Sequence, residues 1–182
     1  MKHALILVCG RPGSGKSTLS KVLAKELKFV LLDKDCIDEP FSPADRSPFY
    51  QTNIEPKAYH ALLNLAELNL ECGQSVILDA PWTHQMFRQP DLVPRVLEVA
   101  EKTKAKLVVL SIELPPDMLR ERLVKRGLKR DLEKFTEEGW TAFAQRMKFA
   151  QKNPLPHFAI DGTESVEQCT QSAVAYIRTC IF

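Results

Sequence analysis

The sequence predicts an α/β fold in which five parallel strands form one sheet and helices cover both of its faces. Short apolar runs alternate with longer segments of helical periodicity along almost the whole chain. Strands separated by helices are joined by right-handed crossovers and therefore run parallel. The first apolar run also passes directly into a glycine-rich loop that a helical segment follows. We expect one domain over residues 1–182, because a chain of this length is long enough for one well-buried core and short for two.

The predicted strands are short apolar runs that lie between turn residues. They cover residues 4–9, 29–32, 75–78, 106–112 and 157–160. Helical periodicity covers residues 16–28, 57–72, 92–103, 116–126, 136–151 and 166–178. Pro116 suits the first turn of its helix, and Ser165 with Gln168 has the spacing of a capping box.

One stretch interrupts this alternation. Residues 39–56 contain four prolines together with Phe41, Phe49 and Tyr50. A loop of this length in a compact domain is usually functional or mobile. Parallel sheets bind ligands at the carboxyl ends of their strands, so we predict an acceptor-side loop over about residues 34–56, where a second substrate binds.

The residues after the first strand have the spacing of a phosphate-binding loop. Glycine permits dihedrals and a close approach that a Cβ would prevent, so backbone N–H groups and the following helix N-terminus can converge on phosphate oxygens. Lys16 is expected to reach the β and γ phosphates, and the Ser17 hydroxyl to bind Mg²⁺. We therefore predict that ATP and Mg²⁺ are bound by Gly10, Arg11, Pro12, Gly13, Ser14, Gly15, Lys16, Ser17 and Thr18.

Three carboxylates follow predicted strands at the ligand-binding edge. Asp33 and Asp35 come after the second strand, and Asp79 comes after the third. Phosphoryl transfer to a hydroxyl needs a group that accepts the hydroxyl proton, and we predict that Asp35 is this base. Asp33 is a candidate contact for the acceptor, and Asp79 either holds Mg²⁺ through water or hydrogen-bonds the acceptor. For each of them the alternative is a turn or a helix cap.

Arginines supply the remaining candidates. Arg122 and Arg126 are four residues apart, and therefore share one face of a helix that follows the fourth strand. A lid over residues 116–150 would bring their guanidinium groups to the γ-phosphate and exclude water. We predict catalytic roles for Lys16, Asp35, Arg126 and, second among the arginines, Arg122; a solvated basic face is the alternative. Arg88 is a candidate for binding an anionic group of the substrate, with surface solvation as its alternative.

Together these motifs resemble the P-loop kinases of the AAA_33 type, a group related to the polynucleotide 5'-hydroxyl kinase domain, gluconate kinase and chloramphenicol phosphotransferase. The phosphate loop and residues 32–35, 76–81 and 122–127 carry the resemblance, which spans nearly the whole chain. It implies a P-loop NTPase fold with a helical lid and the cofactors ATP and Mg²⁺. It also implies that Asp35 is the general base, Arg126 the lid arginine and Asp79 an acid that contacts the acceptor. Residues 161–163 resemble the loop that flanks adenine in these kinases.

The expected activity is transfer of the γ-phosphate of ATP to a hydroxyl of a small-molecule or nucleoside-like acceptor. Polynucleotide kinase carries an arginine shortly after its base, where this chain has Asp38. Because an acid there would repel a substrate phosphate, a polynucleotide 5'-hydroxyl kinase is the less favoured alternative. An NTPase switch or regulatory ATP-binding module is the alternative from another class, but a switch has no use for an acceptor pocket. Trp82, Phe41 and Tyr50 either stack on a flat acceptor or pack within the protein.

Composition limits the partners and the compartment. The formal net charge is +2, with both signs spread along the chain, so there is no footprint of bulk duplex binding. The five cysteines lack paired spacing, which favours free thiols in a reducing compartment. The apolar N-terminal run continues into the phosphate loop, which favours a strand over an export signal, and no run is long enough for a membrane span. We therefore expect a cytoplasmic protein with no membrane contact and no obligate protein partner.

Overall fold

The computed structural model describes residues 3–41, 47–147 and 151–181. Its five strands form one parallel sheet in the order β2-β3-β1-β4-β5. The strands are β1 (Ala4–Gly10), β2 (Val30–Asp33), β3 (Val76–Asp79), β4 (Lys106–Glu113) and β5 (Phe158–Asp161). The predicted sheet is confirmed, and each strand bound lies within one residue of its expected position.

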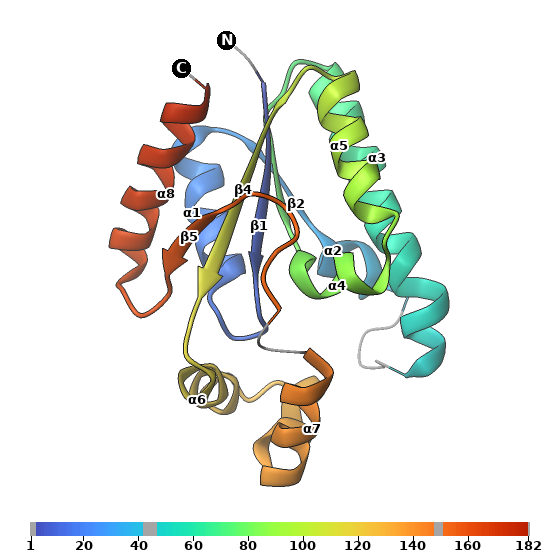
Figure 1. Ribbon diagram of the computed structural model, residues 1–182, viewed down its shortest axis with the longest axis vertical. Helices are drawn as coiled ribbons and strands as arrows, with labels where there is room; N and C mark the ends of the chain where they lie inside the picture. The colour runs from blue at the N-terminus through green and yellow to red at the C-terminus, as the bar shows by residue number, and fades with distance from the viewer. Residues whose placement is uncertain (1–2, 42–46, 148–150, 182) are drawn as a thin grey trace.

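Helices cover both faces of this sheet (Figure 1). On one face lie α1 (Lys16–Leu27) and α8 (Val166–Ile181). On the other lie α3 (Glu55–Glu71), α4 (Trp82–Arg88) and α5 (Leu92–Lys102). Both chain termini lie at the end of the sheet opposite to the carboxyl ends of the strands. The loops that follow the strands therefore share one end of the molecule.

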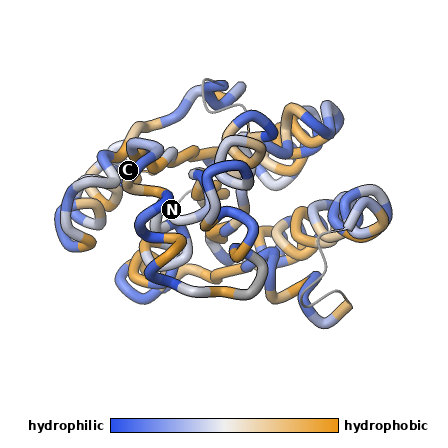
Figure 2. The backbone as a smooth tube through the Cα atoms, turned by 90° about the horizontal axis from the view of Figure 1, so that it is seen from below, coloured by the Kyte–Doolittle hydropathy of each residue, from blue (hydrophilic) through white to orange (hydrophobic). Residues whose placement is uncertain are grey.

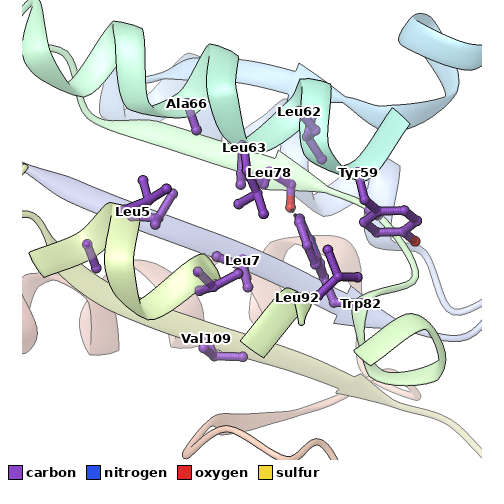
Figure 3. Close-up of a cluster of buried hydrophobic side chains, with 14 of the residues drawn as sticks. Leu5, Leu7, Tyr59, Leu62, Leu63, Ala66, Leu78, Trp82, Leu92 and Val109 are labelled. Carbon is purple, nitrogen blue, oxygen red and sulfur yellow. Dashed lines mark hydrogen bonds between the residues drawn. The ribbon is translucent and has the colours of Figure 1, made fainter. Parts of the chain in front are cut away.

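The larger hydrophobic core lies between the sheet and the layer of α3, α4 and α5. Trp82 and Tyr59 meet there edge to face, with ring centroids 5.0 Å apart. The Trp82 side chain is fully buried, so packing within the protein, rather than stacking on an acceptor, is the correct alternative for this residue. In Figure 3 side chains of α3 point toward the strands across this core: Leu62, Leu63 and Ala66 face Leu5, Leu7 and Leu78.

A second apolar layer lies under α1 and α8 and includes Leu19, Leu23, Ala173 and Ile177. Apolar and polar residues alternate along the helical tubes in Figure 2, as expected for helices that bury one face. Among the described residues, no helix combines the length and the apolar character that crossing a membrane requires.

A small helical unit lies beyond the carboxyl ends of the strands (Figure 1). It contains α6 (Pro116–Arg126), the 3₁₀ segment η2 (Lys129–Phe135) and α7 (Glu137–Met147). Its own apolar cluster is formed by Leu114, Leu119, Leu123, Trp140 and Phe143. This unit matches the predicted lid, although η2 was not predicted. The predicted lid also included residues 148–150, which lie outside the described part of the chain.

Two predicted helix starts are confirmed by their local chemistry. Pro116 occupies the first turn of α6, where its missing N–H costs no hydrogen bond. Before α8, the Ser165 N–H donates to Gln168 Oε1 at 3.1 Å and the Gln168 N–H donates to Ser165 Oγ at 3.2 Å. These reciprocal bonds form the expected capping box.

The stretch predicted as a long loop contains two helical segments. Directly after β2 the chain forms α2 (Lys34–Asp38), and a π-helical turn, η1 (Tyr50–Ile54), leads into α3. Residues 42–46 lie outside the described part of the chain. The loop prediction was wrong for α2 and η1 because buried polar contacts, which have no signature in hydrophobic periodicity, stabilise both segments.

Candidate active site

The phosphate-binding loop connects β1 to α1 at the centre of the sheet. Gly13 and Gly15 have φ angles of 87° and 96°, which L side chains rarely adopt. A Cβ at Gly13 would also lie 3.0 Å from the Leu119 carbonyl oxygen and 3.1 Å from Leu123 Cγ. Glycine is therefore required at the point where α6 crosses the loop, and this crossing places the lid directly beside the phosphate site.

The loop fits a polyphosphate. Ser14 is buried, and among the described residues its hydroxyl has no hydrogen-bond partner. The Lys16 ammonium donates to the Arg11 carbonyl oxygen at 3.5 Å, and burial lowers the pKa of Lys16 against the opposing effects of Asp79 and Asp35. Phosphate oxygens would satisfy the unpaired hydroxyl, the half-buried lysine and the N-terminus of α1.

A groove of about 340 Å³ runs along this loop. Residues of the phosphate loop form one wall, Arg122 and Arg126 of α6 a second, and Gly162 and Glu164 after β5 a third. The structure thus brings the predicted phosphate loop, both predicted lid arginines and part of the predicted adenine loop to one groove.

Asp79 and Ser17 meet at the inner end of the site. Asp79 ends β3 next to β1 and is buried, and the Ser17 hydroxyl hydrogen-bonds its carboxylate. Burial raises the pKa of Asp79, against the opposing effects of Lys16 and Ser17. Mg²⁺ prefers such oxygen donors and usually keeps several waters and phosphate oxygens as further ligands. The pair therefore fits Mg²⁺, although no group of three or more side-chain metal ligands gathers within the described residues.

The two aspartates after β2 differ in their surroundings. Asp33 Oδ1 accepts a hydrogen bond from the Asp35 N–H at 2.9 Å and so caps α2. Burial raises the pKa of Asp33, and Asp79 in the neighbouring strand raises it further. Asp35 lies in the first turn of α2 with 36% of its side chain exposed, and its charge acts on Lys16. Asp35 is therefore accessible to a substrate beside the phosphate loop, whereas Asp33 has the capping role that was its alternative.

The two lid arginines share a helix face but not their partners. The Arg122 guanidinium donates to the Gly162 carbonyl oxygen at 2.9 Å and, more weakly, to the Ser14 carbonyl oxygen at 3.4 Å. It therefore links the phosphate loop to the loop after β5. Arg126 instead pairs with Asp131 of η2, a buried carboxylate that also accepts from Lys134. Arg126 is thus held by the lid itself.

The structure changes the expectations for two charged residues on the acceptor side, Asp38 and Arg88. Asp38 is buried and pairs with Lys34 and Tyr50. The prediction that it would repel a substrate phosphate was wrong, because its charge is compensated inside the protein. Arg88 donates to Glu55 Oε2 at 3.2 Å and to Gln51 Oε1 at 3.4 Å. Its guanidinium therefore already has an anionic partner on α3.

Sequence reasoning missed Asn153, which lies between the lid and β5. Its amide nitrogen donates to Cys9 Sγ and to Thr83 Oγ1, both at 3.1 Å, and its carbonyl oxygen accepts from the Leu155 N–H at 3.0 Å. Burial raises the pKa of the Cys9 thiol to about 12, so this thiol stays protonated. Asn153 thus fixes the chain leaving the lid to the ends of β1 and α4. Its partners are more than 60 positions away in sequence, so no local pattern indicates this role.

The parallel sheet, the phosphate loop and the arginine-bearing lid define a P-loop kinase. A family model described as "AAA domain", AAA_33, matches residues 5–150, and the chain belongs to this family. The predicted resemblance is therefore confirmed.

Several curated relatives and solved structures of similar fold are named as kinases. The shikimate kinase of Chlamydia pneumoniae is 30% identical over 96% of this chain and 99% of its own length. The guanylate kinase of Thermotoga maritima is 26% identical over 72% of this chain and 68% of its own length. The gluconokinase of Sinorhizobium meliloti 1021 has a TM-score of 0.65 at 14% identity over 97% of this chain and 93% of its own. A protein from Chloroflexus aurantiacus J-10-fl shares the fold over the full length of both chains, with a TM-score of 0.75 at 22% identity.

Proposed function

We propose that this chain is an ATP-dependent kinase that transfers the γ-phosphate to a hydroxyl of a small-molecule or nucleoside-like acceptor. The observation that carries the proposal is the meeting of Lys16, Asp79 and Asp35 at the adjacent ends of β1, β3 and β2. Lys16 belongs to the phosphate loop, and the exposed Asp35 carboxylate lies on the side away from the adenine loop. Relatives named for shikimate and gluconate support a small acceptor.

The proposed mechanism uses each side of the site for a different task. The phosphate loop and Lys16 bind the polyphosphate and hold the γ-phosphate. Ser17 and Asp79 would hold Mg²⁺, which supplies positive charge to the phosphate oxygens when it is bound. Asp35 accepts the proton of the acceptor hydroxyl as its oxygen attacks the γ-phosphorus, and the γ-phosphate leaves ADP.

The lid completes the site. Arg126 stabilises charge that develops on the transferring group, and Arg122 supports the loop beside the base of the nucleotide. Closure of residues 116–150 excludes water, whose attack would hydrolyse ATP. Residues 1–182 act as a single kinase domain, with residues 34–56 and Asp33 on the acceptor side. A cytoplasmic location is part of this proposal, because all five cysteines are free thiols.

Polynucleotide 5'-hydroxyl kinase is the second candidate for the same chemistry. The buried Asp38 no longer argues against it, but Arg88 already pairs with Glu55 and is not preorganised for a nucleic-acid phosphate. The exposed Phe41 and Phe49 side chains flank the acceptor side and could stack on a base. An NTPase switch would need neither an acceptor base nor an acceptor pocket.

The experiment is a mass-spectrometric screen for phosphorylated products. The protein is incubated with Mg²⁺-ATP and a library of metabolites, nucleosides, aminoglycosides and oligonucleotides. We expect at least one small hydroxyl compound to gain the mass of one phosphoryl group. Phosphorylation of the oligonucleotides alone would support the polynucleotide alternative, and slow ATP hydrolysis with every compound unchanged would support the switch.

The variant Asp35→Asn assigns the base once an acceptor is known. It should lower acceptor phosphorylation by about a hundredfold or more while ATP affinity stays nearly unchanged. The comparison requires calorimetric binding of ATP and turnover measured side by side. Equal losses in both, or no loss in either, would assign Asp35 a structural role.

A further inference from the structure

A buried lysine lies directly beneath the proposed base. Lys34 is the first residue of α2, and only 3% of its side chain is exposed. Lysine is almost never fully buried unless it is paired. Asp35, its neighbour in sequence, is the accessible carboxylate at the edge of the phosphate site. The contacts of Lys34 therefore bear directly on how Asp35 is held.

The Lys34 ammonium is anchored on its inner side by α2 and η1. It donates to Asp38 Oδ2 at 2.7 Å and to the Tyr50 hydroxyl oxygen at 2.9 Å. Tyr50 also hydrogen-bonds the same Asp38 oxygen, so each of the three buried groups contacts the other two. The ammonium lies 5.6 Å from the centre of the Tyr50 ring and 6.0 Å from that of Tyr59, within cation–π range.

The same ammonium also faces the site. Its nitrogen lies 3.4 Å from Asp35 Oδ1 and 4.0 Å from Glu55 Oε1. Glu55 in turn binds Arg88 of α4 at 3.2 Å. One buried cation thus connects the base to α2, η1, α3 and, through Glu55, to α4.

Asp35 needs such a partner because of its other charged neighbours. Asp33 and Asp79 are carboxylates that act on Asp35 from the ends of β2 and β3. Asp35 also acts on two other titratable groups, Cys36 and Tyr59, and on the cation Lys16. Lys16 is expected to engage the phosphates, whereas the Lys34 ammonium, 3.4 Å from Asp35 Oδ1, stays available to the base during a reaction.

We propose that Lys34 is the positioning residue of the acceptor base: anchored by Asp38 and Tyr50, its ammonium fixes the Asp35 carboxylate beside the phosphate loop. This inference rests on the proposed function, in which Asp35 takes the acceptor proton. Lys34 acts through Asp35 and touches neither ATP nor the acceptor. Positioning matters because a displacement of about 1 Å in a reacting group can cost about a hundredfold in rate.

Stability alone is a weak reason for a buried lysine here. Desolvation often cancels the attraction within a buried ion pair, so apolar residues of similar size are frequently as stabilising. Asp38 offers a matched control, because it pairs with the same ammonium from the side away from the base. Asp38→Asn removes one charge of the set and leaves both Lys34 and Asp35 in place.

The test compares three single variants, Lys34→Met, Lys34→Arg and Asp38→Asn. A double variant combines Lys34→Met with Asp38→Asn, so that neither charge of the buried pair is left without its partner. Each full-length variant is assayed for melting temperature, ATP affinity, and kcat and KM with the acceptor found in the screen. We expect Lys34→Met and the double variant to lower kcat by about ten- to a hundredfold. ATP affinity should stay within about threefold, and Lys34→Arg should recover part of kcat. Asp38→Asn should lower the melting temperature, and because it weakens only one anchor of the ammonium it should lower kcat less than Lys34→Met does.

A double-mutant cycle with Asp35→Asn separates positioning from general stabilisation. If Lys34 acts through Asp35, adding Lys34→Met to Asp35→Asn should cost little further kcat, so the two losses are strongly non-additive. Additive losses, or a near-normal kcat in a folded Lys34→Met protein with a lowered melting temperature, would overturn the inference. If Asp35→Asn itself leaves kcat unchanged, the assignment of the base fails instead, and the two failures are distinguished.

Discussion

The phosphate side and the acceptor side of this site are built in different ways. The phosphate side is one continuous segment, residues 10–18, in which backbone conformation and sequence spacing define the function. The acceptor side is assembled from α2, η1, α3 and α4, whose polar side chains meet only after folding. A local motif is recognisable in sequence. A distributed set of contacts leaves little trace in sequence and depends on charge balance.

The largest effect is expected on the phosphate side. Lys16→Ala should abolish detectable transfer, with kcat falling by about a thousandfold or more, and weaken ATP binding, because the polyphosphate loses the point charge that faces it. Calorimetry and steady-state kinetics measure the two effects. As the control from the other side of the site, Asp35→Asn should leave ATP affinity nearly unchanged. Normal affinity and turnover in Lys16→Ala would contradict the role of the loop.

A second large effect is expected at the lid. If Arg126 meets charge that develops only in the transition state, Arg126→Ala should lower kcat by about a thousandfold while KM for ATP changes little. Arg126→Lys should recover little, because an ammonium cannot reproduce the planar fork of guanidinium donors. A defect confined to KM, or full recovery with lysine, would mean that Arg126 only binds ground-state phosphate or lies on the surface.

Much of the fold follows from local sequence. Alternating apolar runs and helical periodicity predicted all five strands to within a residue, and Pro116 and the Ser165 capping box located two helix starts. The phosphate loop was predictable for the same reason, since its glycines, Lys16 and Ser17 act through neighbours in the chain. Local patterns succeed where the determining contacts are themselves local.

The acceptor side was less predictable because its determinants are long-range and polar. The helix α2 is too short for a periodic signal, and it depends on the Asp33 cap and the burial of Lys34. From the sequence, Asp38 was expected to face the substrate as an acid, but in the fold it pairs with a lysine and a tyrosine. Arg88 was predicted to bind an anionic group of the substrate or to be solvated, but in the fold it pairs with Glu55. The sequence shows which residues are charged, but it does not show which of them form ion pairs in the folded protein.

A smaller effect concerns the stability of the lid and its dependence on pH. Burial would raise the pKa of Asp131, but hydrogen bonds from Lys134 and Arg126 outweigh it and lower the pKa below the ordinary value of 3.8. A carboxylate with a lowered pKa stabilises the folded state above its unfolded pKa, and this contribution is lost as the pH falls through the folded pKa. Asp131→Asn should therefore destabilise the protein by about 1–3 kcal/mol at pH 7.

The destabilisation by Asp131→Asn should be smaller at pH 3 than at pH 7, because the contribution of the carboxylate is lost progressively as the pH falls below the ordinary pKa of 3.8 toward the lowered pKa of the folded state. Thermal unfolding at both pH values measures this difference. Glu133→Gln is a control on the same segment, because Glu133 forms an exposed ion pair with Arg146. It should change stability by less than about 1 kcal/mol at either pH. An Asp131→Asn effect that is equal at both pH values would contradict the ionic origin of the contribution.

The smallest effect compares one hydroxyl from each side of the site. The buried Ser14 hydroxyl has no partner among the described residues, whereas the buried Tyr50 hydroxyl bonds Lys34 and Asp38. Ser14→Ala should leave the free protein as stable as before or slightly more stable, because it removes an unsatisfied polar group, yet weaken ATP binding by about 1 kcal/mol. Tyr50→Phe should do the opposite, lowering stability by about 1–3 kcal/mol with ATP affinity unchanged, because its hydroxyl is already satisfied within the fold. Thermal unfolding and ATP calorimetry on both variants test the pair. A loss of stability in Ser14→Ala without loss of affinity would mean that this hydroxyl serves the fold rather than the phosphate, and the contrast between the two sides would fail at this position.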